Sequence, residues 1–419
     1  MTDGTIRLRH FRRRDVLAAA LASIAAASSA LAAPQNFIRA EGTHLVDVQG
    51  EVFAVKGINL GNWLVPEGYM FKFMRKRAPS EIADVIEALV GREEAEGFWN
   101  EFHDRYITQA DIRFIKATGF NTVRVPVHWR LFVTPGDADD GSADRFEGQG
   151  FVLLDRLLQW CRDADLRVII DLHAAPGGQT GVNHDDGTGF PLTFYVPRYR
   201  NLTIALWRAL AARYHDEPAI LGYDLLNEPI SPYSDEAYLN PRLEPLYREI
   251  VAAIRSVDAH HVVLLAGGQW STSFAMFGRP FDANAVYTYH KFWAKPTRDA
   301  LQSYLNFSKS WNVPILIGET GEMNNQWNAR FRELHERFGI GWVFWPYKSL
   351  DTETAVVSIA KPAGWDLIAQ VGSTDIIDPA VLPPRAQALK ILNAYLEAAK
   401  FRNVRVNGAY LKSLGLAAP

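Results

Sequence analysis

Apolar stretches rich in β-branched and aromatic residues alternate with stretches of helical periodicity along this chain, and this alternation restricts its fold most strongly. Helical periodicity marks Asp155–Arg162, Leu202–Tyr214 and Glu244–Ser256. The apolar stretches between such segments number eight: Val52–Leu60, Asn121–His128, Arg167–His173, Ile220–Glu228, Val262–Gln269, Ala285–Phe292, Pro314–Glu319 and Gly341–Lys348. Each is nearly continuous in apolar residues, which predicts strands covered on both faces. The pattern predicts an α/β fold, a (β/α)8 TIM barrel with crossover helices.

The 419 residues fit one barrel with long βα loops, because no internal repeat or Pro-rich linker divides the chain. We therefore predict one catalytic domain over residues 34–419. The segment Glu67–Ile107 is too long for a simple connection, and we predict that Ser80 caps a helix over Ile82–Leu89 there. This insertion is expected to pack around the barrel mouth.

The first 33 residues have the features of an export signal. Arg12-Arg13-Arg14-Asp15-Val16-Leu17 precedes an Ala/Ser-rich apolar run that ends in Ala30-Leu31-Ala32. This arrangement resembles the twin-arginine signals of bacteria, with cleavage expected after Ala32 or Ala33 and a periplasmic or secreted product. A membrane anchor is the alternative, but a short run of mostly Ala and Ser disfavours stable membrane insertion.

Composition excludes several other kinds of partner and cofactor. A net charge of -3 gives no electrostatic reason to expect nucleic acid. Cys161 is the only cysteine and falls in a helical stretch, so we expect a buried thiol, no disulfide and no cysteine metal site. We expect no cofactor and a monomer. The 12 Trp exceed what core packing usually needs, and exposed rings at strand ends are suited to stacking against sugars.

In such a barrel the reactive groups lie at the carboxyl ends of the strands. Polar or aromatic residues end nearly every stretch: Asn59, Arg124 with His128, His173, Asn227-Glu228, Gln269-Trp270, His290, Glu319 and Trp345. The two glutamates are 319 - 228 = 91 residues apart. At roughly 30 residues for each βα unit, this spacing places them on strands four and seven.

Glu228 and Glu319 so placed face each other across the mouth, which is what a retaining glycosidase requires. One carboxyl group must carry a proton for the leaving oxygen, and the other must be ionised to attack the anomeric carbon. We expect Arg124 to keep Glu319 ionised and the negative neighbour to raise the pKa of Glu228. The alternative is that either glutamate forms a salt bridge at the barrel rim.

Several motifs resemble glycoside hydrolase family 5, the cellulase family. Leu226-Asn227-Glu228-Pro229 resembles its acid/base motif, Ile317-Gly318-Glu319 its nucleophile motif, and Asn121-Thr122-Val123-Arg124-Val125-Pro126 its strand-two arginine motif. Other segments are similar to the exo-β-glucanase and β-glucosidase branch: Asn59–Leu64, Phe98-Trp99, Ile107–Ile112, Asp171–Gln179, Phe344-Trp345 with Lys348, and Gly364–Leu367. The resemblance runs from about Val52 to Leu367.

The resemblance implies a role for each matching residue. Asn227 would bind the sugar 2-hydroxyl, Arg124 would orient Glu319, and Trp345 would form the floor of the sugar site. His173 and His290 would contact hydroxyls or the catalytic carboxyls, or be structural histidines. His128 shares the strand face of Arg124 and is a further candidate for substrate binding. Trp63, Trp129, Trp270 and Trp293 are weaker candidates for stacking.

One position departs from the family pattern. The family usually has a tyrosine two residues after the strand-six histidine, where this chain has Phe292, and that tyrosine hydrogen-bonds the nucleophile. Tyr287 and Tyr289 have the opposite strand parity unless the strand end is bulged. Support for Glu319 is therefore expected from other residues.

The expected substrate is a β-linked glucan oligosaccharide or glucoside. The Glu67–Ile107 insertion and the Ala175–Phe190 loop are expected to close one end of the cleft and favour exo action. An endo-β-1,4-glucanase or β-mannanase is the alternative within the family, and linkage stays open. Outside the family, a non-catalytic glycan-binding barrel would have lost a glutamate. A metal-dependent hydrolase finds no support, because adjacent His260-His261 point to opposite sides of a strand.

Overall fold

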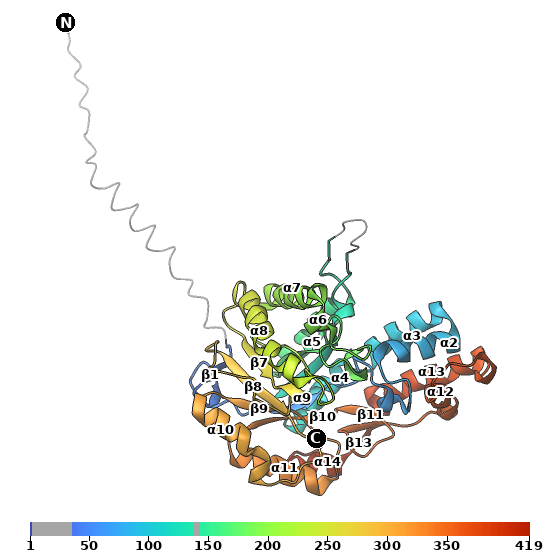
Figure 1. Ribbon diagram of the computed structural model, residues 1–419. Coiled ribbons are helices and arrows are strands. Elements are labelled where there is room, and N and C mark those ends of the chain that lie inside the picture. The colour runs from blue at the N-terminus through green and yellow to red at the C-terminus, as the bar shows by residue number, and fades with distance from the viewer. Residues whose placement is uncertain (2–35, 137–142) are drawn as a thin grey trace. The chain divides into compact units, whose positions relative to one another are not determined.

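Eight parallel strands close into a barrel in which the strands follow one another in sequence order (Figure 1). The computed structural model describes Met1, residues 36–136 and residues 143–419. The barrel strands are β3 (Lys56–Asn59), β4 (Thr122–His128), β5 (Arg167–Ala174), β6 (Ile220–Asp224), β7 (Val262–Ala266), β8 (Ala285–His290), β9 (Ile315–Gly321) and β10 (Gly341–Trp345). β10 pairs with β3 and closes the barrel. The predicted (β/α)8 fold is confirmed, and each of the eight predicted stretches overlaps one barrel strand, with β5 and β9 extending beyond their stretches to Ala174 and Gly321.

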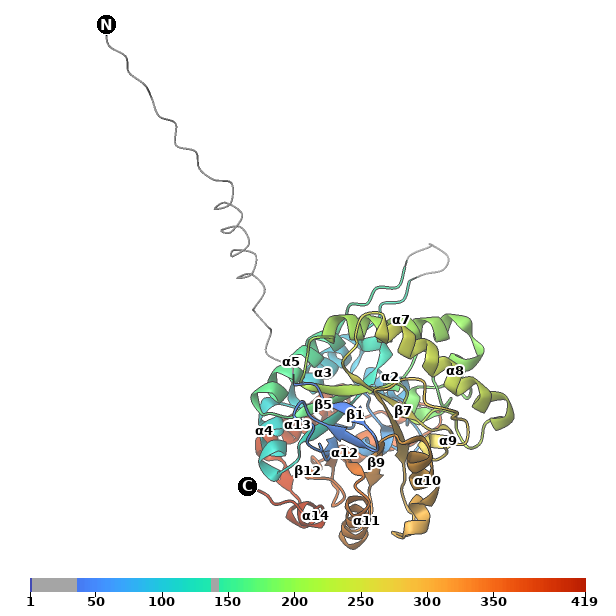
Figure 2. The ribbon, with the colours of Figure 1, turned by 90° about the vertical axis from the view of Figure 1, so that its left-hand side faces the viewer.

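Helices follow the strands and cover the barrel from outside; α7 and α8, for example, lie side by side in both views (Figure 1, Figure 2). The α-helices between or after barrel strands are α4 (Gln109–Thr118), α5 (Gln149–Asp163), α6 (Leu192–Tyr195), α7 (Pro197–Tyr214), α8 (Glu236–Arg255), α9 (Gly268–Ser271), α10 (Gln302–Trp311), α11 (Asn325–Arg337), α12 (Trp365–Val371), α13 (Arg385–Ala399) and α14 (Gly408–Ser413). Short 3-10 helices are η1 (Gly68–Phe71), η2 (Trp129–Leu131), η3 (Asn183–Asp185), η4 (Arg298–Leu301), η5 (Pro379–Val381) and η6 (Phe401–Asn403). A small sheet joins β11 (Lys348–Leu350), β12 (Val357–Ile359) and β13 (Arg405–Val406).

Side chains alternate in direction along each strand, so that one set fills the barrel and the other packs under the helices. The inward set forms a separate apolar cluster: Val55, Ile169, Leu221, Val262, Leu264, Val286, Leu316 and Val343. The hairpin of β1 (Arg39–Glu41) and β2 (His44–Val46) adds Leu45 to this cluster. Val55 precedes β3 and the others lie at or before the middle of their strands, so the amino-terminal end of the barrel is packed and the carboxyl end is available for polar groups.

The insertion after β3 carries two helices, α2 (Pro79–Val90) and α3 (Arg92–Arg105), which pack against α13 (Figure 1). The predicted helix is present, but Ser80 is not its cap. The helix begins at Pro79, one residue before Ser80, so the N-cap residue is Ala78. Ser80 lies inside the first turn, and its backbone N–H and hydroxyl both donate to Asp186.

Residues Phe37–Pro419 form one compact unit. The predicted export signal lies outside the described residues. Cys161 is fully buried on α5, as expected for a thiol used in packing. Among the helices of the described ranges, none combines the length and apolar character needed to cross a membrane.

Candidate active site

A layer of charged side chains lies inside the barrel, toward the carboxyl end from the apolar cluster. Arg124 on β4, Asp171 on β5 and Asp224 on β6 are all fully buried there. Arg124 Nε donates to Asp224 Oδ2 at 2.9 Å, and Nη2 lies 3.0 Å from Asp171 Oδ1. Burial raises the pKa of each aspartate to about 7, and the Arg124 charge opposes that rise. Sequence reasoning missed both aspartates; the available signal was an acid at an inward position of an apolar strand.

Glu319 lies on β9 above this layer. Arg124 Nη1 donates to Glu319 Oε1 at 2.5 Å and to Asn59 Oδ1 at 3.0 Å. Burial raises the pKa of Glu319, while the neighbouring charges of His290, Arg124 and His173 lower it. The predicted contact with Arg124 is present, but burial outweighs its effect and the net shift is upward. The guanidinium holds Oε1 of this carboxylate, and the second oxygen, Oε2, lies 3.8 Å from His290 Nδ1.

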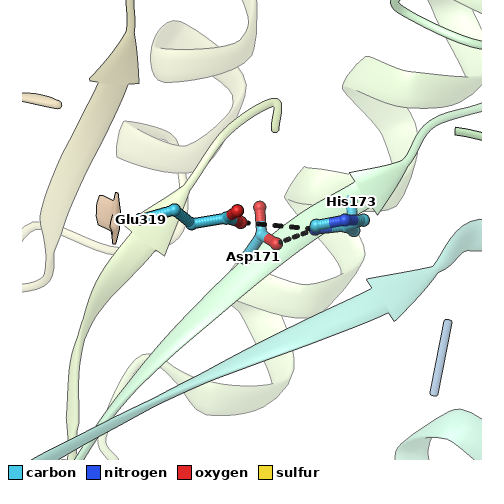
Figure 3. Close-up of side chains that lie close together, drawn as sticks. All are labelled: Asp171, His173 and Glu319. Carbon is cyan, nitrogen blue, oxygen red and sulfur yellow. Dashed lines mark hydrogen bonds and ion pairs between the residues drawn. The ribbon is translucent and has the colours of Figure 1, made fainter. Parts of the chain in front are cut away.

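His173 lies beside Asp171 and Glu319 (Figure 3), and it also contacts Asn227. Its Nδ1 is 2.7 Å from Asp171 Oδ2 and 4.0 Å from Glu319 Oε1, and its Nε2 is 3.4 Å from Asn227 Nδ2. Arg124 Nη2 donates to Asn227 Oδ1 at 2.9 Å. Burial lowers the pKa of His173 to about 4, so the ring is neutral at neutral pH. These contacts orient both the imidazole and the amide at the base of the site.

Glu228 lies in the loop after β6, four residues beyond the last strand residue, Asp224. The strand is therefore shorter than the stretch predicted from the sequence. Glu228 has a left-handed φ of 43°, a conformation that is uncommon outside glycine and concentrates at functional sites. His290 Nδ1 lies 3.0 Å from Glu228 Oε1, and His184 Nε2 lies 3.4 Å from Oε2. Burial raises the pKa of Glu228, against the lowering effects of His184 and Arg124.

The two glutamates face one cavity and lie close to each other. One oxygen of Glu228, one oxygen of Glu319 and one nitrogen of His290 all lie within 4.8 Å of one another. Burial lowers the pKa of His290 to about 3, so a neutral imidazole stands between the two carboxyl groups. The cavity has a volume of about 630 Å³, within the range of small-molecule sites.

Six of the eight residues predicted to form the site line this cavity: Glu228, Glu319, His173, Asn227, His290 and Trp345. Arg124 lies beneath it, fully buried, and acts on the cavity through Glu319 and Asn227. His128 lines a neighbouring cavity, where its Nε2 is 3.3 Å from Asp186 Oδ2. Strand parity predicted that it shares the face of Arg124, but it contacts Asp186 of the 175–190 loop and does not line the cavity of the glutamates.

One end of the cavity is formed by residues after β3 and at the end of β10. The Trp345 ring stacks on His173 with 5.8 Å between centroids, and its Nε1 donates to the Tyr69 hydroxyl at 2.6 Å. Glu67 and Glu322 also line this end. Burial raises the pKa of Glu67 and brings that of Glu322 to about 7. Glu67, Tyr69 and Glu322, together with His184, were not predicted, because they lie in loops whose course the strand pattern does not reveal.

Aromatic side chains mark the opposite, exposed side of the cavity. Tyr233 follows β6, Trp270 follows β7 and Trp293 follows β8. Tyr233 is 84% exposed and Trp293 75%. Of the weaker stacking candidates, Trp270 and Trp293 thus reach the cavity. Trp63 is fully buried in the core, and Trp129 is buried beneath Arg130.

Phe292 lines the cavity where the family tyrosine would stand. Tyr289 points outward and stacks on Tyr304 with 3.9 Å between centroids, so it does not replace that tyrosine despite a register shift at His290. The described contacts of Glu319 come instead from Arg124, His290 and His173.

Two groups of side chains have the spacing of metal ligands: Asp171 with His173 and Glu319, and Glu228 with His290 and Glu319. Arg124 contacts both Asp171 and Glu319, so a permanent positive charge already occupies the position between these carboxylates. A divalent cation there would be repelled at close range. The geometry therefore favours acid/base chemistry over metal binding.

Comparison with known proteins decides the family. A family model described as Cellulase (glycosyl hydrolase family 5) matches residues 87–351, more than half of the chain. This chain belongs to glycoside hydrolase family 5. Similar curated proteins include a beta-xylosidase of Phanerodontia chrysosporium, 32% identical over 58% of this chain and 48% of that protein. A probable glucan 1,3-beta-glucosidase A of Neosartorya fischeri is 30% identical over 52% and 51%.

The chain spans about half the length of these curated relatives. Solved structures share the fold of this family 5 member. An endogalactoceramidase has a TM-score of 0.60 at 15% identity and covers 91% of this chain and 86% of its own. A rutinosidase from Aspergillus niger has a TM-score of 0.55 at 18% identity and covers 72% and 92%. At these identities the likeness concerns the fold.

Proposed function

We propose that this family 5 member is a glycosidase that hydrolyses β-glycosidic bonds with retention of configuration. The observation that carries the proposal is the pairing of Glu228 and Glu319 in one cavity, with oxygens within 4.8 Å of each other. Retaining enzymes hold their two carboxyl groups about 5–5.5 Å apart, whereas inverting enzymes need about 6.5–9.5 Å for a water molecule between them. The short separation supports direct attack by a carboxylate.

Glu319 is the proposed nucleophile and Glu228 the acid/base. In the first step a Glu319 oxygen attacks the anomeric carbon while Glu228 gives its proton to the leaving glycosidic oxygen. In the second step Glu228 takes a proton from water, which attacks the same carbon and releases Glu319. Arg124 favours Glu319 as the ionised group, because its Nη1 donates directly to Oε1.

The contacts of Glu228 suit a group that must alternate between two protonation states. Neutral His290 presents Nδ1 at 3.0 Å, and a neutral imidazole nitrogen donates or accepts according to its tautomer. It can therefore donate to ionised Glu228 or accept from protonated Glu228. A lysine or arginine at this position would instead hold Glu228 permanently ionised and prevent it from acting as an acid.

We further propose exo action. The acid/base is on the side of the cavity that carries Tyr233 and Trp270, so the leaving group extends toward the exposed aromatic side. The sugar that is attacked then occupies the end formed by Trp345, Tyr69 and Glu67. Residues of the loop after β3 line that end, and in this proposal they leave room for few sugar units beyond the cleaved bond.

The proposed substrate is a β-glucan or β-glucoside. The names of the relatives, a beta-xylosidase and glucan 1,3-beta-glucosidases, add β-xylosides and β-1,3-glucans to the substrates to be tested. Purified enzyme should be incubated with β-1,3-, β-1,4- and β-1,6-glucooligosaccharides, xylooligosaccharides and mannooligosaccharides. Monosaccharide or disaccharide release with little early loss of polymer viscosity is expected. A rapid fall in viscosity would establish an endo-glucanase or β-mannanase instead.

Substrates with different leaving groups distinguish the roles of the two glutamates. Glu319→Ala should abolish activity on every substrate, because no glycosyl-enzyme can form. Glu228→Ala should still react with a dinitrophenyl glycoside, accumulate an adduct on Glu319, and regain turnover with azide as the β-glycosyl azide. Glu333→Ala, an exposed acid on α11, serves as control. An α-anomer as the first product of wild type, or equal losses without azide rescue, would refute the assignment.

A further inference from the structure

A second cavity lies beside the catalytic one at the carboxyl end of the barrel. This outer cavity has a volume of about 660 Å³ and is lined by the segment after β3, by α2 and α3, by the end of β4, and by Asp186. In each of two chain segments, neighbouring residues line different cavities. Pro66 faces the outer cavity and Glu67 the catalytic one, while Asp186 faces the outer cavity and His184 the catalytic one. These two segments therefore form the partition between the cavities.

Asp186 attaches the 175–190 loop to this partition. Its Oδ1 accepts the Ser80 backbone N–H at 2.9 Å and the Ser80 hydroxyl at 2.5 Å, and its Oδ2 lies 3.3 Å from His128 Nε2. Its side chain is only 9% exposed. The carboxylate thus joins the loop to α2 on one side and to the end of β4 on the other.

The loop has a separate internal support, which makes the role of Asp186 distinct. Asp185 accepts the backbone N–H groups of Thr180, Gly181 and Gly187 at 2.5, 3.0 and 2.9 Å. These bonds fold the loop on itself, whereas each described bond of the Asp186 side chain goes to α2 or β4. Losing the Asp186 carboxylate should therefore release the loop from the partition without unfolding it.

We propose that Asp186 is a specificity-determining residue: by attaching the 175–190 loop to Ser80 and His128, it separates the catalytic cavity from the outer cavity and restricts cleavage to the chain end. This inference rests on the proposed exo action. With the partition open, the outer cavity becomes a site for further β-linked sugars of the same chain. It offers the surfaces that a sugar requires, with Trp99 and Pro66 as apolar faces and Asn100 and Gln149 as amide partners.

The test compares product lengths from the oligosaccharide series that wild type cleaves best. Asp186→Ala should release disaccharide or longer products from the non-reducing end at least about tenfold more often, relative to monosaccharide, than wild type. Activity on an aryl β-monoglycoside measures the intact catalytic cavity in each variant. Asp165→Ala is the matched control. Both aspartates have a left-handed φ, 59° at Asp186 and 51° at Asp165, and Asp165 also accepts a hydrogen bond from a helix residue, Lys116, but it precedes β5 at the opposite end of the barrel.

Ser80→Ala provides a second variant that removes one donor and keeps the carboxylate. It should shift product length in the same direction by a smaller factor, and it decides the matter if Asp186→Ala fails to fold. Monosaccharide as the sole early product of each folded variant would overturn the inference while leaving the exo proposal intact. Long products from wild type itself would instead refute the exo proposal on which the inference rests.

Discussion

Replacing Arg124 with lysine is expected to lower both stability and turnover, although the charge is kept. The guanidinium makes five contacts: it donates hydrogen bonds to Asp224, Asn59, Glu319 and Asn227, and it forms an ion pair with Asp171. Arginine has five N–H groups in a fixed plane, whereas the lysine ammonium has three donors. At least one of the four hydrogen-bond acceptors must therefore lose its partner around a fully buried side chain.

The cost follows from burial. Each buried polar group left without a partner costs about 1–3 kcal/mol, so the variant should lose at least this much stability. Globular proteins have total stabilities of about 5–15 kcal/mol, so the variant should unfold at clearly lower denaturant concentration and temperature. Turnover should fall about 100-fold, because Glu319 and Asn227 lose the group that positions them. KM should change less than kcat, since Arg124 lies beneath the cavity.

Chemical denaturation and steady-state kinetics measure the two effects. Arg92→Lys is the control, because Arg92 is exposed and pairs with Glu87 at 3.5 Å, an interaction worth about 0–1 kcal/mol. A loss below about 1 kcal/mol in Arg124→Lys, together with an unchanged kcat, would show that the charge alone matters and that the five contacts do not.

The remaining predictions concern pH, packing and export. Because burial raises the pKa of Glu228, kcat/KM of wild type on an unactivated substrate should fall with rising pH only above the usual glutamate range of about 4.3. The same enzyme should lack this alkaline limb on a dinitrophenyl glycoside, whose leaving group needs no proton; a limb unchanged on that substrate would assign it to another group. Gly61→Ala should lower kcat/KM and Tm, because the added Cβ would lie 2.6 Å from the Trp345 ring. Gly97→Ala is the control and should change neither quantity, because a Cβ at Gly97 would have no other atom within 4 Å. Equal effects of the two substitutions would contradict the packing argument. We propose that residues 1–33 are a twin-arginine signal, so Arg13→Lys with Arg14→Lys should leave uncleaved precursor in the cytoplasm, and undiminished periplasmic enzyme on cell fractionation would rule this out.

The local pattern of the sequence was sufficient for the barrel and for the residues that stand on its strands. Continuous apolar stretches predicted the eight barrel strands. Strand parity, together with the position at which each stretch ends, predicted that His173, His290 and Glu319 meet at one end of the barrel. Strand residues obey a period of two that is readable from the sequence, so their direction is predictable. The outward direction of Tyr289 follows from the same rule.

Only the tertiary structure decided which groups meet across the barrel. Arg124 touches side chains from five different strands or loops, and Glu228 reaches its partner from a loop with a left-handed backbone that no strand pattern reveals. The placement of His128 shows the same limit, since the 175–190 loop gives it Asp186 as partner and it lines a different cavity from the glutamates. Loop courses depend on contacts between segments far apart in the chain, such as Ser80 with Asp186. Periodicity carries information about near neighbours only, so the strands were determined by the sequence pattern and the shape of the cavity by the fold.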